Sequence, residues 1–265
     1  MRTKKSALGL KRVVVKVGSA VLTQDGAIAL DRMRSLVDFL SELKKTHEVI
    51  LVSSGAVAAG YTELKIDRTV LKNKQALASI GQPILMKKYT KKFATNDIIT
   101  AQVLVTAANF KKIDDIKRIK DTVDTLLENN VIPIINENDA TATDELVLGD
   151  NDQLSAYITN HTSSDMLIIL SDIDAYYDHD PRENPDAKIL KIVNTIEKSE
   201  LEKSVTPNNI FATGGIVTKL KAASYLLENS KDMFLSSGFD LSDIKSYMLE
   251  NNHRGGTLFT NKGGK

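Results

Sequence analysis

Short apolar runs, mostly of β-branched residues, alternate along the chain with stretches whose apolar residues recur at helical spacing. Alternation of this kind predicts βαβ units and a largely parallel sheet, and hence an α/β fold. Several runs are almost continuously apolar, which is typical of strands buried on both faces. The expected strands cover residues 13–17, 49–52, 98–105, 131–135, 166–170, 233–235 and 257–259. The expected helices cover residues 31–44, 113–129, 217–227 and 243–250.

The chain of 265 residues suits one large domain or two fused lobes, because domains usually contain about 100–200 residues. A polar stretch at residues 160–165, just before an expected strand, is the best candidate for a boundary. We therefore expect one domain with lobes at residues 12–164 and 165–265. Residues 1–11 are basic and lack the apolar segment of a signal peptide, so we interpret them as a solvated leader. A partner-binding arm is the alternative.

Composition and charge exclude several classes of function. Lys and Arg number 35 and Asp and Glu 34, so the net charge of +1 gives no basis for nucleic-acid binding. The absence of Cys excludes disulfides, thiol catalysis and Cys-based metal sites, and it fits a cytoplasmic location. No apolar run approaches the roughly 20 residues of a membrane helix, so no membrane partner is expected. The 4 His residues show no ligand spacing, and no metal held by the protein is expected.

Three polar segments follow expected strands, which is where parallel α/β sheets place their ligands. They are Lys16-Val17-Gly18-Ser19, Ser53-Ser54-Gly55-Ala56 and Ser171-Asp172. Gly lets a backbone N–H approach an anion closely, and a helix that starts there adds a partial positive charge. Lys16 lies near the end of an apolar run, where an unpaired ammonium is costly, so it needs an anionic partner. A structural lysine whose ammonium reaches the surface is the alternative.

A second lysine follows a turn of small residues in Thr213-Gly214-Gly215-Ile216-Val217-Thr218-Lys219. The turn leads into an expected helix, whose first turn normally favours acidic residues because of the helix dipole. Lys219 is placed against that preference, which makes sense if the turn holds a phosphate group that Lys219 also reaches. Gly-Gly before a helix is weak evidence alone, and the Gly-Lys-Ser/Thr of a Walker A sequence is missing.

Asn and Asp are concentrated in two segments, Asn136-Glu137-Asn138-Asp139 and Gly149-Asp150-Asn151-Asp152. Asx turns and helix caps are one explanation of this density. The functional interpretation is a site with donors and acceptors, in which Asn holds a substrate carboxylate and Asp holds an ammonium or a catalytic lysine. The EF-hand pattern is not met, because its Gly and its terminal Glu have the wrong spacing here.

Taken together, these segments resemble the amino acid kinase family, and within it the members that phosphorylate glutamate. The resemblance covers residues 11–259, and its most specific parts are residues 52–56, 135–139, 149–152 and 213–219. Residues 177–182 resemble the nucleotide-side loop of the family. Other members usually carry a Gly-Gly-Gly-type turn where this chain has Ser-Ser-Gly-Ala. The resemblance implies a three-layer α/β sandwich with a mainly parallel central sheet.

The resemblance also implies roles for single residues. As catalytic residues, Lys16 and Lys219 would neutralise the γ-phosphoryl group of ATP, and Asp152 would hold the two lysines in place. Glutamate would be bound by Ser54, Gly55, Asp139 and Asn151. ATP would be bound by Lys16, Gly18, Ser171, Asp172, Thr213, Gly214, Gly215, Ile216, Val217, Thr218 and Lys219. These roles agree with phosphoryl transfer, which needs alignment and charge neutralisation but, with an ionised carboxylate as acceptor, no general base.

The implied reaction is ATP-dependent phosphorylation of the γ-carboxylate of L-glutamate, the first step of proline biosynthesis, with Mg²⁺ carried on the nucleotide. The resemblance further implies a homo-oligomer and proline as a feedback inhibitor. Many members carry a C-terminal PUA domain, and we expect the catalytic domain alone. Ala20 departs from the second small hydroxyl residue that relatives often have. Two alternatives stay open: a kinase of this fold with another acceptor, and a non-catalytic sensor of nucleotides or amino acids.

Overall fold

The computed structural model describes residue 9 and residues 11–141, 151–202 and 215–262. Its strands are β1 (Arg12–Val17), β2 (Thr23–Gln24), β3 (Ala27–Ile28), β4 (Glu48–Ser53), β5 (Thr100–Val105), β6 (Ile132–Glu137), β7 (Met166–Ser171), β8 (Ile192–Val193), β9 (Asp232–Ser237) and β10 (Thr257–Phe259). Its helices are α1 (Ser19–Leu22), α2 (Leu30–Leu43), α3 (Ala56–Glu63), α4 (Leu71–Ala94), the 3₁₀ helix η1 (Ala107–Lys111), α5 (Ile113–Glu128), α7 (Asn151–His161), α8 (Lys198–Leu201), α9 (Ile216–Glu228) and α10 (Ser242–Glu250). Every expected strand and helix is present. The elements without an expected counterpart are the helices α1, α3, α4, η1, α7 and α8 and the short strands β2, β3 and β8.

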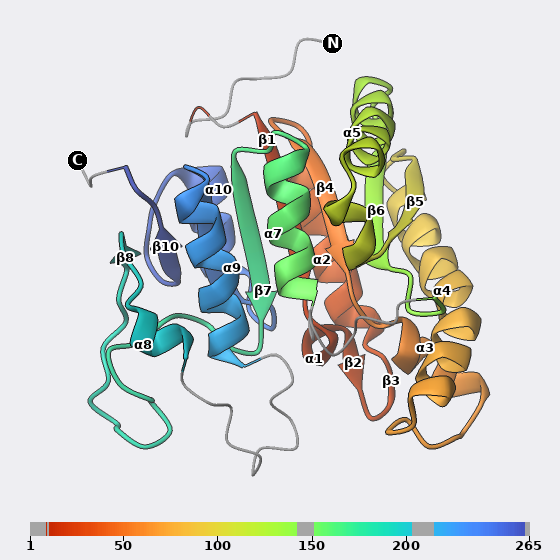
Figure 1. Cartoon of the computed structure of the whole chain (residues 1–265), viewed down its shortest axis with the longest axis horizontal. Coiled ribbons are helices and arrows are strands. Elements are labelled where there is room, and N and C mark those ends of the chain that lie inside the picture. Colours follow the sequence, from red (N-terminus) through yellow and green to blue (C-terminus); the bar gives the residue numbers. More distant parts are fainter. Residues whose placement is uncertain (1–8, 10, 142–150, 203–214, 263–265) are drawn as a thin grey trace.

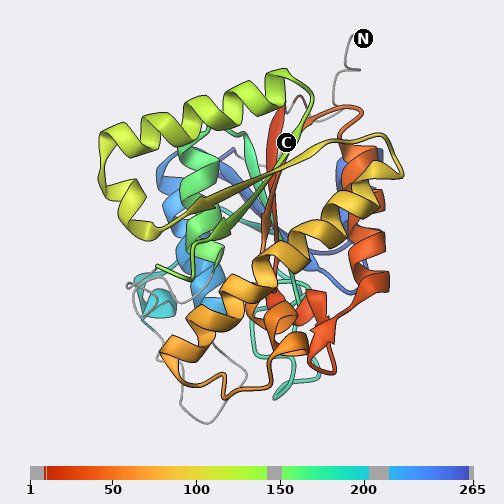
Figure 2. The same ribbon diagram turned by 90° about the vertical axis from the view of Figure 1, so that its right-hand side faces the viewer.

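Eight strands form one sheet in the order β5-β6-β4-β1-β7-β9-β10-β8, with helices on both faces (Figures 1 and 2). Its strand pairs are parallel except for β9 with β10, which is antiparallel. The prediction of a three-layer α/β sandwich with a mainly parallel sheet is therefore confirmed. In the described ranges, no helix has the length and apolar character needed to cross a membrane.

The core is divided by the sheet into two layers, and alternate residues of β1 enter different layers. Val13, Val15 and Val17 pack in the layer that contains residues of α2, α4 and α10. Val14 packs in the layer that contains residues of α5, α7 and α9. Because side chains alternate along a strand, Lys16 points to the same side as Val14, toward α7 and α9. The strand thus fills the core with valines and presents one lysine to the helices of the second layer.

The central position of β1 connects the two parts of the chain that the sequence separated into lobes. β1 pairs with β4 along one edge and with β7 along the other. Strands from residues 12–164 and from residues 165–265 therefore share one continuous sheet. The division into lobes at residue 165 stays a prediction.

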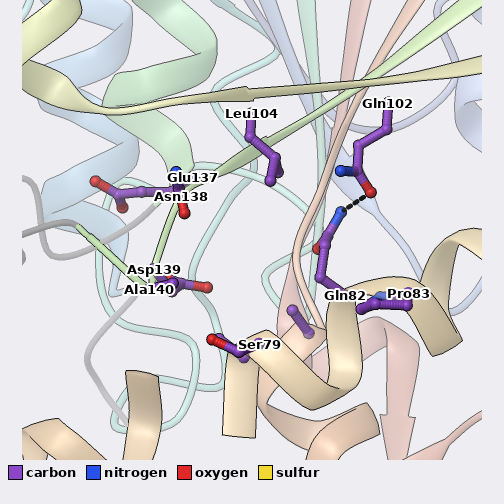
Figure 3. Close-up of a pocket in the computed structure, with 11 residues that line it drawn as sticks. Ser79, Gln82, Pro83, Gln102, Leu104, Glu137, Asn138, Asp139 and Ala140 are labelled. Carbon is purple, nitrogen blue, oxygen red and sulfur yellow. Dashed lines mark hydrogen bonds between the residues drawn. The ribbon is translucent and has the colours of Figure 1, made fainter. Parts of the chain in front are cut away.

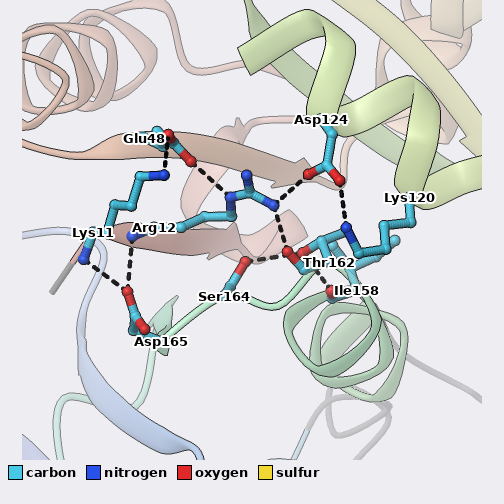
Figure 4. Close-up of polar contacts among 9 residues, drawn as sticks. All are labelled: Lys11, Arg12, Glu48, Lys120, Asp124, Ile158, Thr162, Ser164 and Asp165. Atoms are coloured by element: carbon cyan, nitrogen blue, oxygen red, sulfur yellow. Dashed lines mark hydrogen bonds and ion pairs between the residues drawn. The ribbon is translucent and has the colours of Figure 1, made fainter. Parts of the chain in front are cut away.

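A polar network holds the beginning of β1 at the edge of the sheet opposite its carboxyl end (Figure 4). The Arg12 guanidinium donates to Glu48 at 2.8 Å and to Asp124 at 2.6 Å. Asp165 accepts the backbone N–H groups of Lys11 at 2.7 Å and of Arg12 at 2.9 Å. Because the Arg12 side chain is only 13% exposed, these charge-assisted bonds are partly shielded from water. They tie β1 to β4, to α5 and to the segment that enters β7.

Two glycines bring α3 and α4 into backbone contact. A Cβ atom at Gly81 would lie 1.8 Å from the carbonyl oxygen of Ala56, and one at Gly60 would lie 1.9 Å from that of Leu77. Neither position can hold a larger residue unless the two helices move apart. Since α3 begins immediately after Gly55, this contact fixes α4 relative to the end of β4.

Candidate active site

The carboxyl ends of β1, β4 and β7 lie at one edge of the sheet, where α7 and α9 begin (Figure 1). The three polar segments that follow these strands therefore meet there, as their positions in the sequence predicted. The first turn of α9 brings Lys219 to the same edge, because Lys219 contacts a residue at the start of α7. Segments far apart in the sequence thus converge on one site.

Lys16 and Lys219 bind the two oxygens of a single carboxylate. Lys16 Nζ lies 2.6 Å from Asp152 Oδ1, and Lys219 Nζ lies 3.2 Å from Asp152 Oδ2. The two lysine side chains are 2% exposed and the Asp152 side chain 0%. With all three groups ionised, the cluster has one positive charge in excess. Its charge acts on a nearby anion more strongly than it would in water, because the surroundings have a lower dielectric constant.

Asp152 is held at the start of α7, where a negative charge is favoured by the helix dipole. The Thr218 hydroxyl donates to Asp152 Oδ2 at 2.9 Å and comes from the same helical turn as Lys219. The carboxylate thereby offsets the unfavourable position of Lys219 near the N-terminus of α9. The structure brings together the three residues predicted to be catalytic, and their catalytic role stays a prediction.

Ser54 and Asn151, both predicted to bind glutamate, are in direct contact. Asn151 Nδ2 donates to Ser54 Oγ at 2.9 Å. Ser54 is buried, and its backbone N–H donates to the carbonyl of Val17 at 3.3 Å, which joins the ends of β4 and β1. Gly55 follows with φ of 105°, a left-handed conformation that favours glycine and turns the chain into α3.

A chain of amide side chains extends from Asn151 away from the lysines. Asn151 Nδ2 donates to Asn136 Oδ1 at 3.1 Å, and Asn136 Nδ2 donates to Gln82 Oε1 at 2.9 Å. Gln82 Nε2 in turn lies 3.3 Å from Gln102 Oε1. The sequence drew attention to the segment that contains Asn136, but nothing in it indicated Gln82.

A cavity of about 180 Å³ lies beside this amide chain (Figure 3). It is lined by Ala56, Ala78, Ser79, Gln82, Pro83, Gln102, Leu104, Glu137, Asn138, Asp139 and Ala140. Asp139, which was predicted to bind glutamate, therefore lines the cavity, whereas Ser54 and Asn151 do not. Asn151 is linked to the lining residue Gln82 by hydrogen bonds through Asn136, and Ser54 lies two residues before the lining residue Ala56. The lining combines apolar walls with carboxylates and amides, as small polar ligands require.

The residues predicted to bind ATP occupy the β7 side of the edge. Ser171 is buried; its hydroxyl donates to Asp172 Oδ1 at 2.9 Å and accepts the N–H of Ile173 at 3.3 Å. The N–H of Gly18 donates to the carbonyl of Leu170 at 3.0 Å. Gly215 precedes α9, and Ile216, Val217 and Thr218 form its first turn.

Two parts of the predicted site lie outside the described residues. They are Thr213 and Gly214 of the predicted nucleotide turn, and Gly149 and Asp150 of the second Asn-Asp segment. Among the residues that the structure describes, no cluster of three or more His, Cys, Asp or Glu is placed to hold a metal ion. The described part of the site presents lysines, hydroxyls, amides and carboxylates to a ligand.

The sequence model for the amino acid kinase family matches residues 11–235, which include both lysines and Asp152. The chain belongs to this family. A glutamate 5-kinase from Wolinella succinogenes is 52% identical over 96% of this chain and 99% of its own length. A glutamate 5-kinase from Leishmania donovani is 48% identical over 94% of this chain and 95% of its own length.

Solved structures of amino acid kinase folds agree with the architecture. A carbamate kinase from Giardia lamblia, bound to AMP-PNP, superimposes with a TM-score of 0.64 at 16% identity, covering 94% of this chain and 98% of that one. An isopentenyl phosphate kinase from T. acidophilum, in a product complex, gives a TM-score of 0.63 at 15% identity, covering 94% of this chain and 100% of that one. At such identities the similarity shows the fold of the amino acid kinase family alone.

Proposed function

We propose that this chain is a kinase that uses ATP to phosphorylate the γ-carboxylate of L-glutamate, yielding glutamate 5-phosphate and ADP. The two relatives at about half identity are named glutamate 5-kinases and align over nearly their whole length. The observation that carries the proposal is the buried cluster of Lys16, Asp152 and Lys219, whose excess positive charge suits a phosphoryl group in transfer. Formation of glutamate 5-phosphate is the first step of proline biosynthesis.

The chemistry requires charge neutralisation and alignment rather than a base. A γ-carboxylate oxygen attacks the γ-phosphorus of ATP, the bond between that phosphorus and the bridging oxygen breaks, and its electron pair leaves with ADP. Lys16 and Lys219 neutralise the charge that spreads over the phosphoryl oxygens, while Asp152 keeps the two ammonium groups close together. The nucleotide brings Mg²⁺, which neutralises phosphate charge further.

The amino-acid substrate meets groups of complementary polarity on the β4 and β6 side. The Ser54 hydroxyl accepts from Asn151 and can donate its own hydrogen to the α-carboxylate. Asn151 Oδ1 and the Asp139 carboxylate can accept from the α-ammonium. Gly55 makes the left-handed turn, with φ of 105°, that leads from Ser54 into α3.

The nucleotide is assigned to the β7 and α9 side. Ser171 ends β7, and Asp172 and Gly18 directly follow β7 and β1. Gly215 precedes α9, whose N-terminus favours phosphate, and Ile216, Val217 and Thr218 form its first turn. For Thr213 and Gly214, the assignment rests on the sequence resemblance. Proline as a feedback inhibitor, assembly into a homo-oligomer and a cytoplasmic location belong to the same proposal and rest on that resemblance and on the absence of Cys.

The test is an assay of ADP release with a panel of acceptors: glutamate, aspartate, acetylglutamate, carbamate and UMP. We expect turnover with glutamate and acid-labile phosphorylation of its side chain, seen by trapping the product with hydroxylamine. Activity confined to UMP or acetylglutamate would overturn the proposed substrate. ATP binding without turnover of any acceptor would favour a sensor instead.

A further inference from the structure

Gln82 is a buried amide in the middle of α4 that has no part in the phosphoryl transfer described above. Its side chain points from the helix toward β5 and β6, with Nε2 bonded to Gln102 (Figure 3). Gln82 is 8% exposed, and its Oε1 accepts from Asn136, which is 2% exposed. The interaction joins α4 to the end of β6, next to the proposed glutamate site.

A backbone group fixes the direction of every hydrogen bond in this amide chain. The N–H of Glu137 donates to Asn136 Oδ1 at 2.9 Å, and a backbone N–H can only donate. Asn136 Oδ1 must therefore face Glu137, which turns Asn136 Nδ2 toward Gln82. Because Nδ2 can only donate, Gln82 has to present its oxygen there, as it does at 2.9 Å.

The orientation of Asn136 also determines which groups donate and which accept at Asn151 and Ser54. Asn151 Nδ2 donates to Asn136 Oδ1 at 3.1 Å and to Ser54 Oγ at 2.9 Å, and the carbonyl oxygen of Ser53 is a more distant acceptor at 3.4 Å. With both hydrogens of Nδ2 engaged, Oδ1 is the end of the Asn151 amide that can accept from a ligand. The substrate therefore meets an acceptor on Asn151, which suits an ammonium, and a donor on Ser54, which suits a carboxylate.

We propose that Gln82 is a positioning residue that gives the enzyme its selectivity for an α-amino acid over a dicarboxylate without an amino group. Gln82 Oε1 and the Glu137 N–H hold the two ends of the Asn136 amide, Asn136 Oδ1 then accepts from Asn151, and Asn151 offers an acceptor to the α-ammonium. The inference rests on the proposed function, because it assumes that glutamate is bound at Ser54 and Asn151.

The packing of α4 suits Gln82 to this task. Gly81 places the backbone of α4 against the carbonyl of Ala56, only a residue beyond Gly55. Gln82 is therefore held at a fixed distance from the turn that carries Ser54. A side chain on a mobile loop could not keep an amide oriented to the same degree.

The test compares glutamate with glutarate, which has both carboxylates of glutamate but lacks the ammonium. We expect Gln82→Met, which removes the acceptor with little change in length, to raise the KM for glutamate about tenfold. The KM for glutarate, the KM for ATP and kcat should change less than about threefold, so that the preference for glutamate falls. A purely structural role would not alter glutamate and glutarate differently.

Two further variants make the test specific. Gln82→Glu keeps an oxygen facing Asn136, so it should retain the preference for glutamate. Lys87→Met, at an exposed position of the same helix α4, should leave the preference unchanged. If Gln82→Met does not fold, as judged by its thermal transition, Gln82→Ala carries the same comparison.

Two results would overturn the inference: an unchanged ratio of glutamate to glutarate in folded Gln82→Met, or an equal loss of that ratio in Gln82→Glu. Failure of the proposed function is recognised separately, because the unmodified enzyme would then not phosphorylate glutamate at all.

Discussion

Lys16 in β1 forms a salt bridge of 2.6 Å with Asp152 at the start of α7, and both side chains are almost completely withdrawn from water. A buried lysine needs an anionic partner, and a buried carboxylate needs a cation or several donors. Here the carboxylate serves a second lysine as well. The three groups therefore form one contact cluster, and a variant at any of them should affect the other two.

We expect Asp152→Asn to lower kcat about a hundredfold or more, because two buried ammonium groups then repel each other without a carboxylate between them. The melting temperature should fall as well, since the amide cannot neutralise either lysine. Steady-state kinetics and a thermal transition measure the two effects. The matched control is Asp121→Asn, at a carboxylate that is 63% exposed, and it should change neither. Turnover close to that of the unmodified enzyme would contradict the organising role of Asp152.

Lys16→Ala and Lys219→Ala should each lower kcat strongly while changing the KM values much less, because both lysines act on charge that develops during transfer. Lys221→Ala, at an exposed position of the same helix α9, is the control. Addition of Asp152→Asn to Lys16→Ala should cost less than the product of the two separate losses, since the residues are in contact. Full turnover in Lys219→Ala would show that the mechanism is wrong even if glutamate is the substrate.

Asp139→Ala should raise the KM for glutamate about tenfold or more with a small change in kcat, because its carboxylate is assigned to binding of the α-ammonium in the ground state. The KM for ATP, measured on the same variant, is the internal control and should stay constant. Calorimetric titration of glutamate provides a direct measure of binding. An unchanged affinity would remove Asp139 from the substrate site.

Gly81→Ala should lower the free energy of unfolding by about 3 kcal/mol or more, since its Cβ would lie 1.8 Å from the carbonyl oxygen of Ala56 and both atoms belong to rigid backbone. Separation of α3 from α4 should also displace Ser54 and raise the KM for glutamate. Urea unfolding and kinetics test these effects. Lys91→Ala, at an exposed site of the same helix, should be nearly neutral. A stability equal to that of the unmodified protein would mean that the two helices are not in backbone contact.

Stability should decrease on acidification, and His47 should contribute to the decrease. Burial lowers the pKa of His47 below its usual 6.5, and its buried Nε2 has no hydrogen-bond partner among the described residues. The unfolded chain therefore binds a proton at His47 more readily than the folded chain. Its contribution to stability is fully present above the unfolded pKa and is lost as the pH falls from about 6.5 toward the folded pKa.

Urea unfolding at several pH values between about 7.5 and 5 measures this linkage. His47→Leu should lose less stability over that interval than the unmodified protein, whereas His179→Asn, at a side chain that is 66% exposed, should lose the same amount. An identical pH dependence in His47→Leu would assign the effect to other groups.

The strands and the amphipathic helices could be predicted because the pattern of apolar residues within each short segment is enough to identify it. Val13, Val14 and Val15 mark a buried strand without reference to the rest of the chain. The free-energy cost of burying an unpaired ammonium in such a run also predicted an anionic partner for Lys16, and this partner is Asp152. That this partner is Asp152 came from the family resemblance, because no local pattern distinguishes it from its acidic neighbours.

Other parts of the site could not be read from local patterns. The buried face of helix α7 includes the polar residues Asp152, Ser155 and Thr159. Its apolar residues alone therefore do not recur at helical spacing, and the segment could not be recognised as a helix. Gln is a residue type usually found on the exposed face of a helix, so nothing local predicts that Gln82 is buried. Its burial depends on contact with Asn136, which is distant in the sequence. The close approach of Gly60 and Gly81 likewise depends on two helices at once.

The place of β1 in the sheet has a consequence for how the protein is made. β1 is the first strand to leave the ribosome, yet it stands between β4 and β7, and β7 ends only at Ser171. One edge of this central strand therefore stays unpaired until more than half of the chain has been made. Contacts between such distant segments slow folding, and an open strand edge favours aggregation. The nascent chain is thus most in need of a chaperone between the synthesis of β4 and that of β7.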